Sequence, residues 1–290
     1  MREATYGRGT AGAATLRRPI VALVLALTTI CVATAAAEIG SPVEYVLNAS
    51  GTTAPSRLPD GRPVAIALKV GFTSEALGSA TTPELGRIAI ELNQAIELNT
   101  EGLPSCPLSV VGSPTADPTK SCARSLVGRG VVDSEITLPG QAPVKVEGSL
   151  LAFYAFAEGA PRILARVVTG EPLPVVYVIP FEIHQAPRTL GTVLRVKKMH
   201  ILHGICRTGF SNCFAQPYNL NGVYGRISSL QLTLHRSFAY DGQRASFAAA
   251  HCPHRASTSS NTFPLLRVTA HYAEQTATES TRSPVVSGSC

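Results

Sequence analysis

The chain has 290 residues, a formal net charge of +6 and seven cysteines, and 45% of its residues are hydrophobic. Its first 37 residues carry four arginines and one glutamate, so their removal as a leader would leave 21 basic and 18 acidic residues and a net charge of +3. This balance gives no basic field for nucleic acid, while about 250 residues can bury the core of one large β-domain or two small ones.

The N-terminus has the three parts of a signal peptide. Arg17-Arg18 ends a basic segment, Pro19–Thr34 is an apolar run too short for an ordinary bilayer span, and Ala35-Ala36-Ala37 provides small residues for cleavage. We expect cleavage near Ala37, secretion or residence in the cell envelope, and no transmembrane segment in the mature chain. The alternative is an uncleaved membrane anchor, although no basic stop-transfer run follows.

Removal of the leader also removes Cys31 and leaves an even number of cysteines. In an exported chain this indicates disulfides, and six cysteines permit fifteen pairings. Proximity in the sequence favours three of these pairs: Cys106 with Cys122, Cys206 with Cys213, and Cys252 with Cys290.

The first half of the mature chain shows mainly a two-residue period. Val43–Leu47 suits an edge strand, and Ile66–Phe72 alternates apolar and small or polar residues. Ile88–Leu98 fits either a helix or a strand, and we prefer the strand because only Gln94 breaks the alternation. Asp117-Pro118 resembles an N-cap followed by proline at the first helical position, which predicts one or two helical turns within residues 119–126.

Beyond this point, segments rich in Val, Ile, Leu and aromatic residues alternate with Gly and Pro turns. Two of these segments, Leu150–Phe156 and Val175–Ile179, are apolar on both faces and are expected to be central strands. Asp241-Gly242 between alternating segments predicts a tight hairpin. The predicted strands of this half are Val131–Leu138, Val144–Phe156, Ile163–Val168, Val175–Ile183, Thr192–Leu202, Leu230–Phe238, Phe247–Cys252 and Phe263–Tyr272.

These patterns predict an all-β protein with about ten antiparallel strands and minimal helix, arranged as a β-sandwich or a jelly-roll-like fold. No linker or repeat divides the mature chain. We therefore expect a signal peptide over residues 1–37 and one exported domain over 38–290, with a polar tail over about 273–290. Residues 203–221, which contain Cys206 and Cys213, are expected to form a loop outside the sheet.

Several segments resemble a family of uncharacterised exported proteins from high-GC bacteria. The resemblance spans about Ala65 to Cys252. It is carried by Leu103-Pro104-Ser105-Cys106, by Cys122 with Ser125-Leu126-Val127-Gly128-Arg129-Gly130, by Leu150-Leu151-Ala152-Phe153, and by Phe238-Ala239-Tyr240-Asp241-Gly242. It implies an exported, β-rich, disulfide-bonded protein and no particular activity. The pair Cys206 and Cys213 departs from shorter members.

The histidines and cysteines do not form a persuasive metal site. His200 and His203 would point to opposite faces of a strand, and Cys252 in His251-Cys252-Pro253-His254 is better used in a disulfide. There is no G-x-S-x-G nucleophile elbow. We expect no catalytic residue, no metal and no cofactor.

Two further hypotheses stay open beside non-catalytic binding. Asp133 and Glu135 share one strand parity, with Glu147 on a neighbouring strand, which would suit a hydrolase of extracellular glycans. Strands that are apolar on both faces would also suit a carrier of an apolar ligand in a β-lined cavity. The preferred hypothesis is an exported binding protein, or a structural component of the envelope or extracellular space, with an unidentified partner.

Overall fold

The computed structural model describes residues 44–77, 82, 84–137, 140–170, 176–186, 191–197, 224–253, 262–272 and 285–290. The chain divides into two units, Met1–Pro42 and Val43–Cys290, and all described residues belong to the second. The predicted signal peptide, the loop over 203–221 and the pair Cys206 and Cys213 lie outside the described residues.

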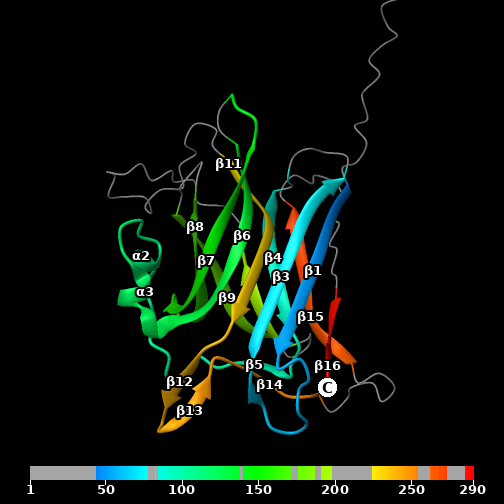
Figure 1. Cartoon of the computed structure of the whole chain (residues 1–290), viewed down its shortest axis with the longest axis vertical. Helices are drawn as coiled ribbons and strands as arrows, with labels where there is room; N and C mark the ends of the chain where they lie inside the picture. The colour runs from blue at the N-terminus through cyan, green and yellow to red at the C-terminus, as the bar shows by residue number, and fades with distance from the viewer. Residues whose placement is uncertain are drawn as a thin grey trace, which may run out of the picture. The chain divides into compact units, whose positions relative to one another are not determined.

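Eleven antiparallel strands form one large sheet, in the order β1-β3-β11-β6-β7-β8-β9-β10-β4-β15-β16 (Figure 1). Two smaller sheets, β2-β14-β5 and β12-β13, lie near one end of it. The strands are β1 (Glu44–Ala54), β2 (Val64–Ala65), β3 (Ala67–Leu77), β4 (Leu85–Leu92), β5 (Ile96–Leu98), β6 (Leu126–Thr137), β7 (Val144–Ala157), β8 (Ala160–Thr169), β9 (Val176–Ala186), β10 (Gly191–Val196), β11 (Tyr224–Leu234), β12 (Ser237–Tyr240), β13 (Gln243–Ser246), β14 (Ala248–Ala250), β15 (Thr262–Tyr272) and β16 (Val285–Ser289).

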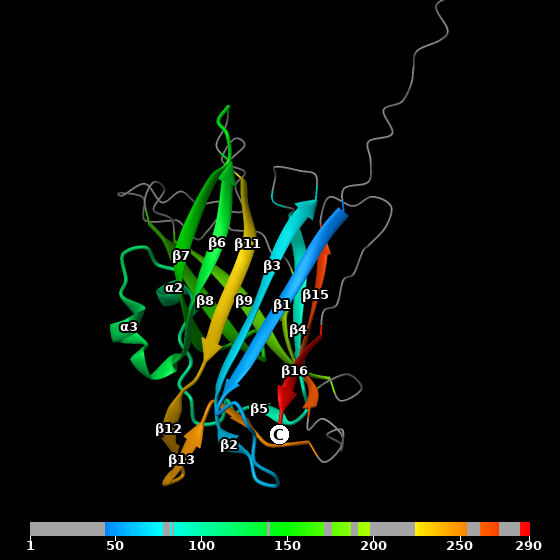
Figure 2. The same cartoon turned by 45° about the vertical axis from the view of Figure 1, so that its right-hand side comes forward.

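The two ends of the large sheet come close to each other. The Leu58 amide donates to the Ser289 carbonyl at 3.3 Å, and the Ser289 hydroxyl donates to the Ser56 carbonyl at 2.8 Å. A Cβ on Gly51 of β1 would lie 2.4 Å from a side-chain carbon of Leu266 on β15, so the two strands approach closely at this glycine. The sheet is therefore nearly closed, and β1 runs beside β15 and β16 (Figure 2).

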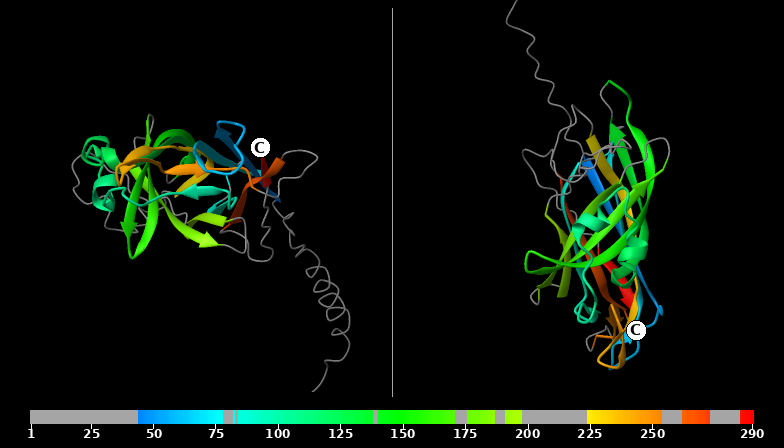
Figure 3. Two further views of the ribbon diagram at one scale, coloured as in Figure 1. Left: turned by 90° about the horizontal axis from the view of Figure 1, so that it is seen from below. Right: turned by 90° about the vertical axis from the view of Figure 1, so that its left-hand side faces the viewer.

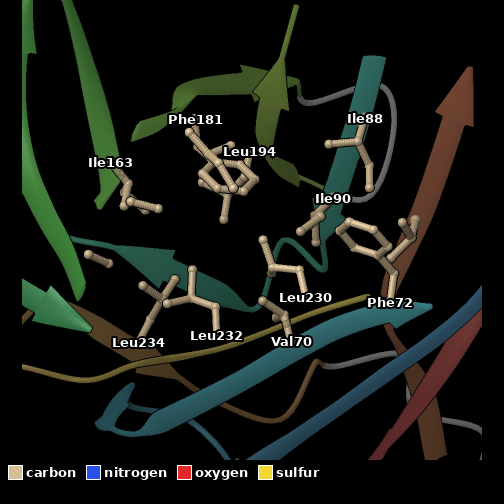
Figure 4. Close-up of a cluster of buried hydrophobic side chains, with 14 of the residues drawn as sticks. Val70, Phe72, Ile88, Ile90, Ile163, Phe181, Leu194, Leu230, Leu232 and Leu234 are labelled. Carbon is tan, nitrogen blue, oxygen red and sulfur yellow. The ribbon is translucent and has the colours of Figure 1, made fainter. Parts of the chain in front are cut away.

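Side chains from opposite walls of this sheet fill its interior. Figure 4 shows Val70 and Phe72 of β3 facing Ile88 and Ile90 of β4, with Phe181 of β9 nearby. All five are buried, with exposed fractions of 1% or less. Along each wall, the antiparallel register places inward residues of neighbouring strands opposite each other, such as Leu194 and Ile90, or Leu230 and Phe72.

The all-β, antiparallel prediction is confirmed. The large sheet has eleven strands rather than about ten, and it is one curved sheet where two stacked sheets were considered. The five strands outside it have only two to four residues each. Of these, β5 and β14 lie within the predicted strands Ile88–Leu98 and Phe247–Cys252, and β12 and β13 form the predicted hairpin.

Ile88–Leu98 is extended, as predicted, but it divides into β4 and β5. The break lies at Asn93, whose side-chain oxygen accepts a hydrogen bond from the Ala95 amide at 2.9 Å while its amide group donates to the Pro264 carbonyl. This turn re-aims the chain, so that β4 pairs in the large sheet and β5 pairs with β14. Gln94, the residue that interrupts the alternation, lies in the turn.

The Asp241-Gly242 hairpin is also confirmed. It joins β12 and β13, and both turn residues have positive φ, 49° at Asp241 and 73° at Gly242. The segment expected as a polar tail contains a strand, since β16 pairs with β15 at the edge of the large sheet.

Two disulfides are present, Cys106–Cys122 and Cys252–Cys290, with Cα separations of 5.7 and 5.3 Å. They are two of the three pairs that proximity favours, and intramolecular disulfides are typical of extracytoplasmic proteins. The described helices are too short to cross a bilayer.

One buried polar pair lies within this core. The hydroxyl groups of Ser134 on β6 and Tyr177 on β9 are 2.9 Å apart, and both residues are almost fully buried. Burial raises the pKa of Tyr177 to about 12, with a smaller contribution from the charge of Asp133, although the hydrogen bond to Ser134 acts in the opposite direction.

This pair predicts a loss of stability in alkali. The folded-state pKa of Tyr177 lies above the unfolded-state value of about 10, so its contribution is complete below pH 10 and is lost as the pH rises through 12. Urea unfolding should show about 1 kcal/mol of this loss by pH 11. Tyr177→Phe should be about 1–3 kcal/mol less stable at pH 8, because Ser134 loses its partner. The difference between variant and wild type should then narrow above pH 10. A constant difference would contradict the assignment.

Candidate functional site

A cross-linked loop, residues 103–125, covers part of the outer face of the sheet. The Cys106–Cys122 disulfide closes it, and it contains α2 (Leu108–Val111), α3 (Pro118–Ser121) and a 3-10 turn, η1 (Ala123–Ser125). Figure 3 shows the helices lying outside the strands. The loop is thus an added layer over the middle of the sheet, around β7 and β8.

The predicted N-cap is present at Asp117. Its side chain accepts a hydrogen bond from the Thr119 amide at 3.0 Å and another from the Thr119 hydroxyl, and Pro118 follows as the first helical residue. The hydrogen bonds from Thr119 and the charge of Lys120 lower the pKa of Asp117. The short helix is therefore determined locally, whereas α2 had no recognisable sequence signal.

A second apolar core lies beneath this loop. The disulfide sulfurs and Val111 pack against outward-facing residues of three strands: Phe153 and Ala155 of β7, Leu164 of β8 and Val178 of β9. The inward-facing residues of the same strands belong to the main core. Leu150–Phe156 and Val175–Ile179 are apolar on both faces for this reason: one face meets the interior and the other meets the loop.

Arg166 of β8 fastens the loop to the sheet. Its guanidinium donates to the carbonyl oxygens of Val111 at 2.7 Å and Ser113 at 2.6 Å, and the residue is 7% exposed. Burial lowers the pKa of Arg166, opposed by the charge of Asp117. A charged residue in the middle of the apolar run 163–168 is the sequence signal that could have predicted this contact.

An outer groove of about 590 Å³ lies between the cross-linked loop and the ends of β7, β8 and β9. Its walls are mainly apolar, and two of its residues are large, hydrophobic and open to solvent: Phe156 is 57% exposed and Leu108 is 50% exposed. Its lining residues are Ser105, Cys106, Pro107, Leu108, Ala155, Phe156, Ala157, Glu158, Arg162, Leu164, Val178 and Pro180.

Charged side chains adjoin the groove at Arg162. This guanidinium pairs with Glu158, and it lies 3.6 Å from a carboxylate oxygen of Glu182. Lys197 contacts the same oxygen of Glu182 at 2.9 Å, and His184 contacts the other oxygen at 2.8 Å. Burial of Glu182 raises its pKa, but hydrogen bonds from His184 and Lys197 and their charges outweigh this and hold the pKa below its usual range. Arg162, the cation of the groove wall, is therefore already partnered by carboxylates.

The three carboxylates of the hydrolase hypothesis lie on β6 and β7. Asp133 and Glu147 are directly opposite each other in the antiparallel register, and both are exposed. Glu135 is 3% exposed and accepts hydrogen bonds from the amide and hydroxyl of Thr82 at 3.3 and 3.1 Å. Asp133 also accepts a hydrogen bond from the Ser229 hydroxyl. None of these carboxylates lines the outer groove.

Of the histidine and cysteine candidates, the structure describes His251 and Cys252. Cys252 is in a disulfide, and His200, His203 and His254 lie outside the described residues. Within the described ranges, no group of three or more His, Cys, Asp or Glu side chains could hold a metal ion.

Comparison with known proteins gives no relative. No family model matches the chain, and neither a search of curated proteins nor a search of solved structures finds a similar one. The functional argument therefore depends on the geometry of the outer groove itself.

Proposed function

We propose that this chain is a non-catalytic binding protein that works outside the cytoplasm and takes a small apolar molecule in the outer groove. The observation that carries the proposal is the exposure of Phe156 and Leu108 on either side of one apolar hollow. Large side chains that remain in water cost hydrophobic free energy, and their clustering is typical of binding surfaces. Export is supported by the leader and by the two disulfides.

The size and support of the groove agree with such a ligand. A volume of about 590 Å³ lies within the usual range for small-molecule sites. The disulfide and Arg166 hold the loop that forms one wall, so little ordering should be needed when a ligand binds. Because Arg162 is already paired, the groove offers little free charge, which favours a neutral apolar ligand over an anionic one.

The other hypotheses have weaker support. The part of the interior that the structure describes is packed with side chains, which disfavours a carrier with a ligand inside the sheet. The carboxylate of Glu135 already accepts two hydrogen bonds from Thr82, and Asp133 and Glu147 are exposed. Both observations disfavour a hydrolase. A structural role in the envelope would require no ligand in the outer groove.

The test is binding of a neutral apolar fluorescent probe, N-phenyl-1-naphthylamine, to the purified mature protein. Phe156→Asp and Leu108→Asp should each weaken probe binding at least about tenfold, equal to about 1.4 kcal/mol, because each replaces apolar wall by a charge. Leu77→Asp is the matched control, since Leu77 is also 50% exposed and lies outside the groove. Its affinity should equal that of the wild type.

Equal affinity in all four proteins would place the probe elsewhere, and a lack of saturable binding would favour the structural role. Both results would overturn the proposal. If the probe binds in the outer groove, native mass spectrometry of the protein isolated from an exporting host would identify a natural ligand by its mass.

A further inference from the structure

A second hollow, the basic hollow, brings together four basic side chains that are far apart in the sequence. Arg129 comes from β6, His235 and Arg236 follow the end of β11, and Arg244 comes from β13. The hollow has a volume of about 530 Å³ and shares no lining residue with the outer groove. It is therefore independent of the function proposed above.

The backbone fixes the positions from which these side chains extend. Arg129 is the register partner of Thr233, and the His235 amide donates to the Val127 carbonyl at 2.8 Å. The Phe247 amide donates to the Arg236 carbonyl at 2.7 Å, which ties the β12-β13 hairpin to the end of β11.

The hairpin that carries Arg244 is supported from a second side. Tyr240, near the tip, packs against Gly102, where a Cβ would lie only 2.3 Å from the tyrosine ring. Gly102 also has a φ of +76°, so both space and backbone conformation require glycine there. The basic hollow is thus built on hydrogen-bonded strands and a packed hairpin.

The positive charge of this hollow is not neutralised within the described part of the protein. Its lining contains no Asp or Glu, and none of the described ion pairs involves Arg129, Arg236 or Arg244. The Nε of Arg236 is buried and has no hydrogen-bond partner. Arg162 differs, because two carboxylates partner it at the outer groove.

These features fit one kind of ligand. Guanidinium groups bind oxyanions through paired N–H donors, and a tetrahedral oxyanion has enough acceptor oxygens to engage several of them. The hydroxyl groups of Thr233 and Ser237 also line the hollow and can donate to the same oxygens. An anion there would reduce the repulsion among the cations.

We infer that the basic hollow binds a tetrahedral oxyanion with three terminal oxygens, the chemistry that a phosphate monoester and a sulfate ester share. The oxyanion would accept from Arg129, Arg236 and Arg244, while His235 would provide one further ring N–H. The volume leaves room for the organic group that carries the oxyanion.

Isothermal titration of the mature protein with inorganic phosphate and with inorganic sulfate, at constant ionic strength in chloride, tests this inference. Saturable binding to the wild type is expected. Arg129→Gln and Arg244→Gln should each weaken it at least tenfold, whereas Arg62→Gln should leave it unchanged. Arg62 is the matched control, because it is exposed, lies outside the hollow and changes the net charge equally.

Arg129→Lys separates recognition by the paired N–H donors of the guanidinium from the effect of the positive charge alone. It keeps the charge but loses the paired donors, so an affinity between those of Arg129→Gln and wild type is expected. Arg244 is exposed on the β12-β13 hairpin, so Arg244→Gln should fold even if the Arg129 variants in β6 do not. Circular dichroism verifies the fold of each variant.

Two outcomes would overturn the inference: no saturable binding of either anion, or the same loss of affinity in Arg62→Gln as in Arg129→Gln. Sedimentation with vesicles distinguishes the source of the oxyanion. Pelleting with vesicles that contain phosphatidic acid, whose headgroup is a phosphate monoester, but not with phosphatidylcholine alone, and only when Arg129 and Arg244 are intact, would identify a lipid headgroup. Anion binding without pelleting would identify a soluble ligand.

Discussion

Arg166→Met is expected to lower the free energy of unfolding by about 3–5 kcal/mol, because the buried carbonyl oxygen of Val111 and the partly buried one of Ser113 both lose a hydrogen bond from a charged donor. Methionine has a similar length, so packing beneath the cross-linked loop should change less than hydrogen bonding. Urea unfolding followed by circular dichroism measures the effect. Since α2 carries Leu108, probe binding in the outer groove should weaken as well.

Two further variants define this result. Arg166→Lys keeps the positive charge but lacks the paired N–H donors of a guanidinium. Its loss of unfolding free energy should therefore lie between those of the wild type and Arg166→Met. Arg62→Met is the control, since Arg62 is exposed and lies outside the cross-linked loop. A surface substitution of this kind changes the free energy of unfolding by about 0.5 kcal/mol or less. If Arg166→Met were no less stable than Arg62→Met, the loop would not depend on the buried guanidinium.

Phe181→Ala should also cost about 3–5 kcal/mol, through a cavity in the middle of the main core. Phe181 is fully buried and faces the side chains of opposite strands (Figure 4). Phe156→Ala is a control of the same residue type, because Phe156 is 57% exposed, and it should change stability by less than about 1 kcal/mol. Urea unfolding again measures both.

This comparison also tests whether the interior is filled. A small loss in Phe181→Ala would mean that its surroundings are loosely packed, and the hypothesis of an apolar ligand inside the sheet would regain support. With a large loss, the new cavity should be apolar and able to bind benzene, which the wild-type interior should not do.

The sequence predicted the local structure well. The two-residue period identified β3, and runs rich in Val, Ile, Leu and aromatic residues identified β6, β7, β8, β9 and β15, because both patterns are visible within a single strand. Asp241-Gly242 predicted its hairpin and Asp117 its N-cap, since both signals depend on neighbouring residues alone. Cys106 and Cys122 were recognised as a pair, but the surface that they help to build was not.

The candidate sites could not be predicted in the same way. The outer groove combines residues 105–108, 155–164 and 178–180, and the basic hollow combines residues 126–129 with 233–244. Arg129 and Thr233 become neighbours only through the pairing of β6 with β11, which are about 100 residues apart in the sequence. Alternation predicts that a strand exists but does not predict its partner.

By itself, the sequence of this protein determined that strands form, where most of them turn, and that Cys106 pairs with Cys122, because these properties follow from short-range periodicity, turn chemistry and proximity in the chain. Only the tertiary structure decided that eleven strands curve into one nearly closed sheet, that a loop covers the second apolar face of β7–β9, and that distant arginines converge. The physical reason is that long-range strand pairing sets which surfaces meet. The free energy of that pairing is shared over the whole core and is not encoded in any single segment.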